Sequence, residues 1–326
     1  MSTLRAQAGL ALGELRSPRV RVIIPVYNGA AFIASAIESV KAQSFTDWEL
    51  TIVDDGSTDD TVPIVSKYCS SRIVLVRQTR QGDEAARVRA MAGAQTDYLA
   101  RLDADDMMVP DRLAKQVAFM DENGEVGLLG GQIMYVSEDG TKKGFRSWWP
   151  CGHEEIVGLL LKRKGCICNP TLMVRREISD KLTWPLPGVP GKDSGYVLEL
   201  SNLCAIANLK DVVIYMRIHK NSIQSGWNPA KIHTELYYIR RYCSQKSGLP
   251  PPRWNEFELS CKNQPWHKTF VLWYRFKVGS CFRRGMWTWL NRSPKFLSWP
   301  WFVLAGIMSP QRVMARLTRR LKAMFR

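Results

Sequence analysis

The chain has 326 residues, 45% of them hydrophobic and 23% charged, which is long and apolar enough for a folded protein with a sizeable core. Its formal net charge of +16 lies in the last third, because residues 231–326 hold 19 Lys/Arg against 3 Asp/Glu and residues 1–230 hold 27 of each. The eight cysteines show no Cys-x-x-Cys spacing, which argues against a disulfide framework and favours a reduced, cytoplasmic chain.

The N-terminal part predicts a strand, a helix and a second, parallel strand. Residues 1–18 contain no continuous apolar run, so we expect a flexible leader rather than a secretory signal. An apolar strand at 21–26 precedes a helix at 30–43, whose apolar residues share one face: Ile33, Ile37 and Val40. The next strand, 50–53, runs into the acidic turn 54–60. In such sheets, ligands bind beyond the carboxyl ends of the strands.

Three carboxylates follow the apolar run 98–100, at Asp103, Asp105 and Asp106. Carboxylate oxygens are the ligands that Mg²⁺ or Mn²⁺ prefers. The alternative is a solvated acidic turn before the helix that begins near Pro110. Further helices are expected at 61–69 and 83–94, and further strands at 73–76, 126–136, 169–175 and 208–215.

Three segments carry a resemblance to a known family. In their order and spacing, residues 22–28, 52–59 and 102–106 resemble the signature segments of the family 2 glycosyltransferases, and the similarity extends from about 19 to about 225. The resemblance implies a GT-A fold, an α/β architecture with a mixed sheet flanked by helices. It also implies a catalytic domain at 19–228, with a nucleotide half at about 19–106 and an acceptor half at about 107–228.

The resemblance assigns roles to residues in these segments. Tyr27 can stack on uracil and Asp55 can accept the uracil imide N–H, while Asp103 is assigned to the ribose. Further contacts with the nucleotide sugar are expected from Pro25, Gly82 and Arg217. Mn²⁺ or Mg²⁺ is expected on Asp105, with Asp106 and His219 as further ligands. A half-buried tyrosine, an ordinary turn glycine and a structural histidine are the alternatives at Tyr27, Gly82 and His219.

Asp193 is the candidate catalytic base. The family pattern is an acidic pair before a helix, and Lys192-Asp193 retains only the second acid. Asp193 would take the proton from the acceptor hydroxyl, and helix N-capping is the alternative role. A second departure is Val88, which follows Ala86-Arg87 where the family usually has Asn. These departures keep open a non-catalytic sugar-nucleotide-binding or scaffold protein, and a nucleotidyltransferase is another rival.

Residues 229–326 predict a basic, aromatic-rich and mainly helical extension. Seven of the twelve tryptophans lie in this region, and a basic amphipathic helix is expected at 309–326. Trp and Arg together suit a membrane surface, although packing against the catalytic domain or a partner protein is the alternative. No nucleic-acid module is recognisable, so no nucleic-acid partner is expected.

Together, the sequence predicts an inverting hexosyltransferase. It would use a UDP-sugar donor and a hydroxyl of a lipid-linked or cell-surface glycan as the acceptor, at the inner face of the cell membrane, with other proteins of glycan assembly as possible partners. The donor sugar, the acceptor and the linkage are not readable from the sequence.

Overall fold

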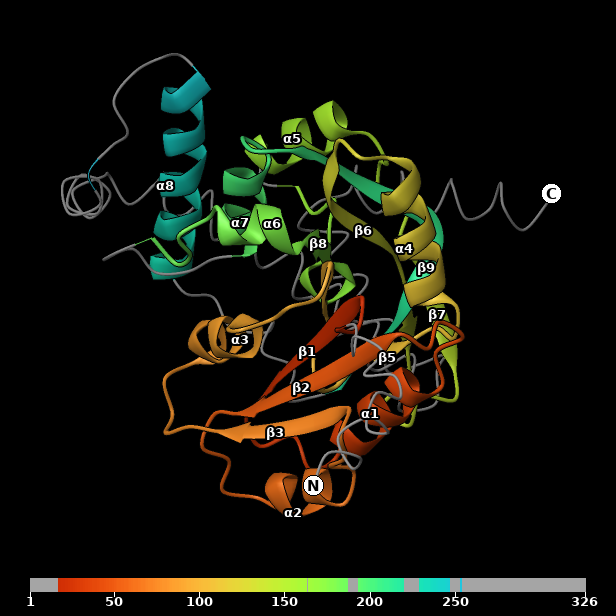
Figure 1. The fold of residues 1–326 in the computed structure, drawn as a ribbon. Coiled ribbons are helices and arrows are strands. Elements are labelled where there is room, and N and C mark those ends of the chain that lie inside the picture. Colours follow the sequence, from red (N-terminus) through yellow and green to blue (C-terminus); the bar gives the residue numbers. More distant parts are fainter. Residues whose placement is uncertain (1–16, 163, 187–192, 220–228, 247–252, 254–326) are drawn as a thin grey trace, which may run out of the picture.

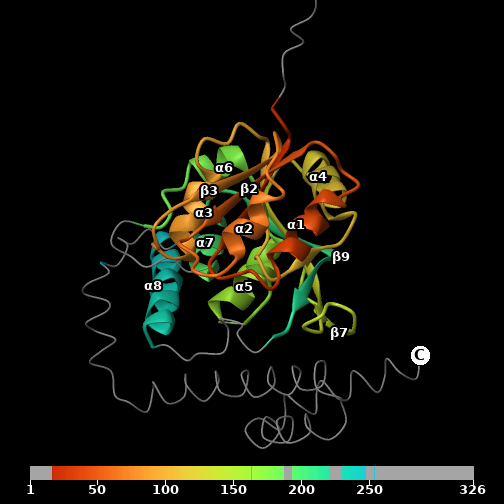
Figure 2. The same ribbon diagram turned by 90° about the horizontal axis from the view of Figure 1, so that it is seen from below.

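The computed structural model describes residues 17–162, 164–186, 193–219, 229–246 and 253. These residues form a mixed sheet of nine strands with helices packed around it, as Figures 1 and 2 show from two sides. The strand order is β3-β2-β1-β4-β8-β6-β9-β5, and β7 pairs with β6 outside this path. The predicted mixed α/β fold is confirmed.

The first half contains the parallel part of the sheet. Strands β1, β2, β3 and β4 all run in the same direction, so their carboxyl ends meet at one edge. The elements in chain order are β1 (Val20–Val26), α1 (Ile33–Lys41), β2 (Trp48–Asp54), α2 (Thr61–Ser66), β3 (Ile73–Arg77), α3 (Asp83–Met91) and β4 (Tyr98–Arg101). The predicted strand–helix–strand unit is therefore present, and the acidic turns follow β2 and β4 at that shared edge.

The second half continues the sheet with antiparallel pairs. Strand β8 joins β4 to β6, and β9 runs parallel to β6 but antiparallel to β5. The elements are β5 (Met107–Met108), α4 (Arg112–Glu122), β6 (Val126–Val136), β7 (Lys143–Arg146), α5 (His153–Leu161), β8 (Met173–Arg175), α6 (Arg176–Asp180), α7 (Asp193–Leu200), β9 (Ala205–Arg217) and α8 (Pro229–Lys246).

One predicted strand is wrong over half of its length. Residues 169–175 were expected as a single strand, but Asn169–Thr171 form a short 3-10 turn and only Met173–Arg175 pair with neighbours. Pro170 has no backbone N–H and cannot complete a ladder in the middle of a sheet, which favours the turn. The turn places Asn169 beside Arg101 at the end of β4, where the Arg101 Nη1 donates to Asn169 Oδ1 over 2.5 Å.

The main core lies between the sheet and the helices beside it. The predicted apolar face of α1 is fully buried, since Ile33, Ile37 and Val40 are all 0% exposed. Helix α4 buries its own stripe of Leu113, Val117 and Met120 in the same cluster. Both periodic patterns in the sequence therefore mark true core faces, which fix the helices beside the strand ends.

A second core joins α7 to α8. Tyr237, Tyr238 and Tyr242 of α8 are buried with Trp184 and Tyr196 in one apolar cluster. Figure 1 shows α8 beside α7. The predicted domain boundary at 228 therefore falls before a helix that shares a core with the acceptor half.

The predictions for the two ends of the chain lie mostly outside the described residues. This applies to most of the leader, to the seven tryptophans of the extension and to the helix at 309–326. Within the described part of the chain, no helix is both long enough and apolar enough to cross a membrane.

Candidate active site

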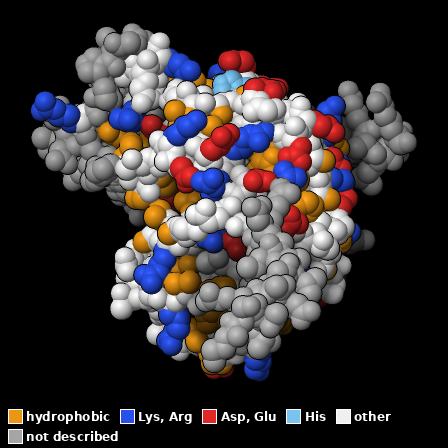
Figure 3. Space-filling view, in the orientation of Figure 1, with side chains coloured by type: hydrophobic (Ala, Val, Ile, Leu, Met, Phe, Trp, Pro, Cys, Tyr) orange, Lys and Arg blue, Asp and Glu red, His pale blue; other side chains and the backbone are white. Residues whose placement is uncertain are grey.

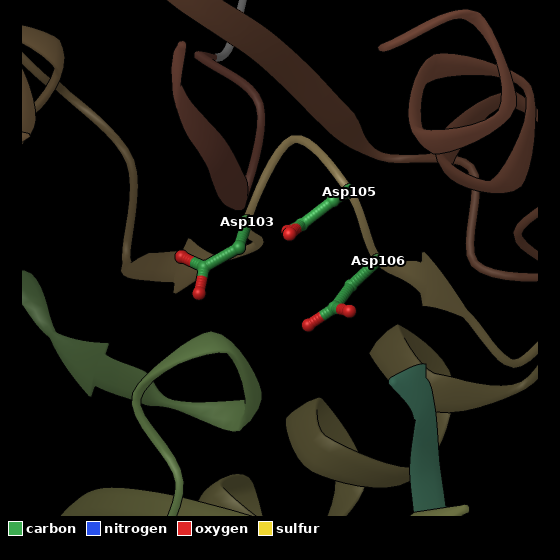
Figure 4. Close-up of side chains that lie close together, drawn as sticks. All are labelled: Asp103, Asp105 and Asp106. Atoms are coloured by element: carbon green, nitrogen blue, oxygen red, sulfur yellow. The ribbon is translucent and has the colours of Figure 1, made fainter. Parts of the chain in front are cut away.

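Three carboxylates gather in the loop between β4 and β5. Figure 4 shows Asp103, Asp105 and Asp106 close together on this loop, and one oxygen of each lies within 4.8 Å of the others. The loop is a tight turn in which the Asp106 N–H donates to the Asp103 carbonyl over 3.1 Å. This turn thus brings three carboxylates from four consecutive positions close together, which is the donor set that a hard divalent cation prefers.

The crowding of these acids perturbs their protonation. Burial, followed by the charge of Asp105, raises the pKa of Asp103 to about 7, against the opposing effect of Arg87. Burial and the charges of Asp105 and Asp103 also raise the pKa of Asp106 well above its usual value. The Asp103 side chain remains 35% exposed, so a cation in solution can reach it. A bound cation would relieve this repulsion, and the residues present fit such a group.

His219 joins the carboxylates from the far end of β9. Its Nε2 lies 2.9 Å from Asp105 Oδ2, although 114 residues separate the two in the chain. The imidazole also packs on the ring of Phe32, with centroids 4.7 Å apart. The structure therefore brings together the three residues that were expected to bind a metal, Asp105, Asp106 and His219, and places Asp103 beside them.

Arg217 lies at the same place but its guanidinium is bonded within the protein. Its backbone N–H donates to Asp106 Oδ1 over 3.0 Å, Nε donates to the Asp105 carbonyl over 3.0 Å, and Nη1 donates to the Glu138 carbonyl. The remaining nitrogen, Nη2, donates to Ser35 Oγ over 3.0 Å. Arg217 is only 5% exposed, so these contacts make it a support for the carboxylate loop. The contact with the nucleotide sugar that was expected from Arg217 stays a prediction.

The nucleotide-side residues cluster after β2. Asp55 is buried, and its carboxylate accepts hydrogen bonds from Gln78 Nε2 and from the backbone N–H groups of Gln81 and Gly82, at 2.7 to 2.8 Å. These donors lower its pKa against the effect of burial, which is the largest single influence and acts in the opposite direction. Asp55 thereby links the turn after β2 to the segment before α3. Few of its carboxylate lone pairs remain to accept a hydrogen bond from uracil.

The other predicted nucleotide contacts differ in exposure. Tyr27 is 37% exposed, and the guanidinium of Arg80 lies 3.6 Å from its ring centroid, so one face of the ring is already stacked. Pro25 is buried where β1 pairs with β2 and therefore supports the strand end. Gly82 has a φ of 99°, which favours glycine, and no described atom lies within 4 Å of where a Cβ would be.

Asp193 is the first residue of α7. Its side chain is 56% exposed, and Oδ1 lies 3.4 Å from Arg87 Nη1. The same guanidinium reaches Asp103, with Nη2 and Oδ1 separated by 3.3 Å. The sequence analysis noted Arg87 only as part of a family motif. Its contact with Asp193 spans 106 residues, and no local pattern in the sequence signals it.

Comparison with known proteins identifies the family of this chain. Residues 21–183, half of the chain, match the family model described as "Glycosyl transferase family 2". The chain belongs to glycosyltransferase family 2. It is 39% identical over 218 residues to the putative teichuronic acid biosynthesis glycosyltransferase TuaG of Bacillus subtilis, a match that covers 66% of this chain and 85% of TuaG. This family assignment makes the chain a glycosyltransferase.

Two further relatives have a lower identity or match over a shorter stretch. The UDP-Glc:alpha-D-GlcNAc-diphosphoundecaprenol beta-1,3-glucosyltransferase WfaP of Escherichia coli is 29% identical over 209 residues, which cover 64% of this chain and 80% of WfaP. The putative glycosyltransferase EpsE of Bacillus subtilis is 37% identical over 129 residues, 38% of this chain. That match spans 46% of EpsE, less than half of that protein.

Solved structures share the fold of this glycosyltransferase. TarS of S. aureus in complex with UDP-GlcNAc superposes with a TM-score of 0.57 at 19% identity, over 91% of this chain and 83% of TarS. The mannosyltransferase PcManGT of Pyrobaculum calidifontis, in complex with GDP-Man and Mn²⁺, superposes with a TM-score of 0.54 at 16% identity, over 96% of this chain and 82% of that one. These similarities confirm the predicted GT-A fold.

Proposed function

We propose that this glycosyltransferase moves a hexose from a UDP-sugar to a hydroxyl group with inversion at the anomeric carbon, in a reaction that requires a divalent cation. The proposal rests on one arrangement of side chains. One oxygen each of Asp103, Asp105 and Asp106 lies within 4.8 Å of the others, and Arg87 contacts both Asp103 and Asp193. The complexes of TarS with UDP-GlcNAc and of PcManGT with GDP-Man and Mn²⁺ support the donor class and the metal.

On the donor side, Asp105 and Asp106, with His219, would hold Mn²⁺ or Mg²⁺. When bound, the cation supplies positive charge that stabilises the departing diphosphate. Arg217 keeps the turn that carries these residues in one conformation, because it is bonded to both Asp105 and Asp106. Asp103, whose Oδ1 faces Arg87, would meet the ribose, and Tyr27 offers the uracil the ring face that Arg80 does not cover.

On the acceptor side, Asp193 acts as the general base. Its exposed carboxylate at the first turn of α7 takes the proton from the acceptor hydroxyl while that oxygen forms the new glycosidic bond. UDP leaves from the opposite face of the sugar in the same displacement, so the configuration at the anomeric carbon inverts. No covalent intermediate with the enzyme is needed.

The proposed acceptor is a lipid-linked or cell-surface glycan. WfaP is named for a diphosphoundecaprenol-linked acceptor and TuaG for teichuronic acid biosynthesis, and both support this class. The basic, Trp-rich extension after residue 253 adds a sequence argument, because such segments suit the headgroup layer of a membrane. We therefore place the enzyme on the cytoplasmic face of the cell membrane.

The test is UDP release from a panel of UDP-sugars, with and without Mn²⁺, with a detergent extract of host membranes as the acceptor. We expect release from one donor, dependent on metal and strongly reduced, but still measurable, in Asp193→Asn. Asp180→Asn is the matched control, because Asp180 is an acid of similar exposure, 58% against 56%, away from the carboxylate turn. UDP binding without release from any donor would instead favour a non-catalytic binding or scaffold protein.

A further inference from the structure

One buried arginine contacts acids from three parts of the chain. Arg87 lies on α3 and is 5% exposed. On its own helix it pairs with Asp83, at 2.6 Å, and with Glu84, at 3.3 Å. It also reaches Asp103 of the carboxylate turn and Asp193 at the start of α7.

The two long-range contacts use different nitrogens of the guanidinium. Nη2 faces Asp103 Oδ1 at 3.3 Å, and Nη1 faces Asp193 Oδ1 at 3.4 Å. A planar guanidinium carries its donors in a fixed fork, so the position of one acid constrains the position of the other. Arg87 is thus a rigid bridge between the nucleotide half and the acceptor half of the site.

The other contacts of Arg87 keep that bridge in place. The tight pair with Asp83 anchors Nη1, and Glu84 also accepts a hydrogen bond from Trp184 Nε1 in the second core. Arg87 is therefore held by acids of its own helix, and one of them, Glu84, is bonded to the core that also contains residues of α7. A residue that only balanced charge would not need this restraint, since a flexible lysine supplies the same charge.

We propose that Arg87 is a positioning residue that holds Asp103 and Asp193 in register, so that the donor site and the catalytic base are aligned through one side chain. The inference rests on the proposed role of Asp193 as the base. Arg87 itself contacts no reacting atom in this scheme. Its effect passes through the two carboxylates, and misplacing a catalytic group by about 1 Å costs on the order of 10²-fold in rate.

Arg87 differs from the exposed arginine of the same helix. Arg89 is exposed, two residues away on α3, and makes no described contact with Asp103 or Asp193. Arg89→Gln is therefore a matched control for Arg87→Gln. Arg87→Lys keeps the charge but replaces the fork by a single ammonium, which cannot span both carboxylates in the same way.

The experiment combines kinetics, a double-mutant cycle and UDP binding on the full chain. We expect Arg87→Gln to lower kcat by about 10²-fold with a smaller change in the acceptor KM, and Arg87→Lys to recover part of the loss. In the Asp193→Asn background the same Arg87→Gln change should cost less than about threefold, because the group that it positions is already disabled. If Arg87 were merely structural, Arg87→Gln would lower kcat by the same factor in the wild-type and the Asp193→Asn backgrounds. That result would overturn the proposal.

The binding arm separates this inference from the proposed function. Calorimetry of UDP binding needs no acceptor and no turnover. We expect Arg87→Gln to weaken the binding of UDP by about tenfold, because Asp103 is no longer held in place, and Arg89→Gln to bind UDP like the wild type. If the wild type transfers no sugar, the proposed function fails while this arm still reports on the bridge to Asp103. Wild-type UDP affinity in Arg87→Gln would overturn the inference, and Arg87→Lys serves both arms if the glutamine variant does not fold.

Discussion

Gly195 offers a sharp test of how tightly α7 and α8 are joined. A Cβ at this position would lie 2.4, 2.6 and 2.7 Å from three ring atoms of Tyr238. The ring cannot move aside easily, because Tyr238 is 0% exposed and lies 5.2 Å from the ring centroid of Trp184. Forcing one extra methyl group into such a packed core costs about 1–3 kcal/mol. We therefore expect Gly195→Ala to destabilise the protein by that amount relative to the same substitution at an uncrowded helical glycine.

The assay is urea unfolding, followed by intrinsic fluorescence, with the midpoint and the slope both fitted. Gly158→Ala is the control, because Gly158 lies within α5 and a Cβ there would meet no atom within 4 Å. Its expected effect has the opposite sign, a gain of up to about 1 kcal/mol from helix propensity. A Gly195→Ala protein as stable as the Gly158→Ala control would refute the close packing of α8 on α7.

Three further predictions concern the carboxylates and the C-terminal extension. Asp105→Asn should reduce transfer by at least about 10²-fold and leave the urea midpoint close to that of the wild type, and near-normal turnover would contradict the role of Asp105 in holding the metal. Because the pKa values of Asp103 and Asp106 are raised, protons compete with the cation, so Mn²⁺ affinity should increase from pH 6 to pH 8. Calorimetry in buffers of different ionisation enthalpy should then show proton release on binding, and a pH-independent affinity would exclude this competition. Removing residues 309–326 should weaken binding to anionic vesicles more than catalysis on a soluble acceptor, whereas an equal loss of both would indicate a structural tail.

Local patterns were sufficient for most of the fold. The spacing of Ile33, Ile37 and Val40 identified a buried helical face, and the apolar runs identified β1, β2 and β6, because both signals depend only on near neighbours. The 3-10 turn at Asn169 was missed because it depends on where Pro170 lies in the sheet. The chain position alone does not show whether a strand is central.

The site was predictable in its parts but not in its connections. Asp103, Asp105 and Asp106 lie within four consecutive positions, so their clustering follows from a single turn. Arg217 illustrates the limit, since its sequence context suggested a contact with the nucleotide sugar but did not indicate the bonds that its nitrogens make to Asp105, Glu138 and Ser35. Such assignments depend on which distant segments become neighbours, and one sequence without its tertiary contacts does not contain that information in a local form.

The bond from Arg217 Nη2 to Ser35 Oγ also has a consequence for biosynthesis. It joins residues 182 positions apart, and His219 meets Asp105 across 114 positions. Closing loops of this length is entropically costly and slows the formation of the contacts that depend on them. A nascent chain that has emerged only as far as β8 already contains the three carboxylates but lacks both Arg217 and His219. Metal-binding competence should therefore arise late in translation, after the strand at 205–217 has left the ribosome.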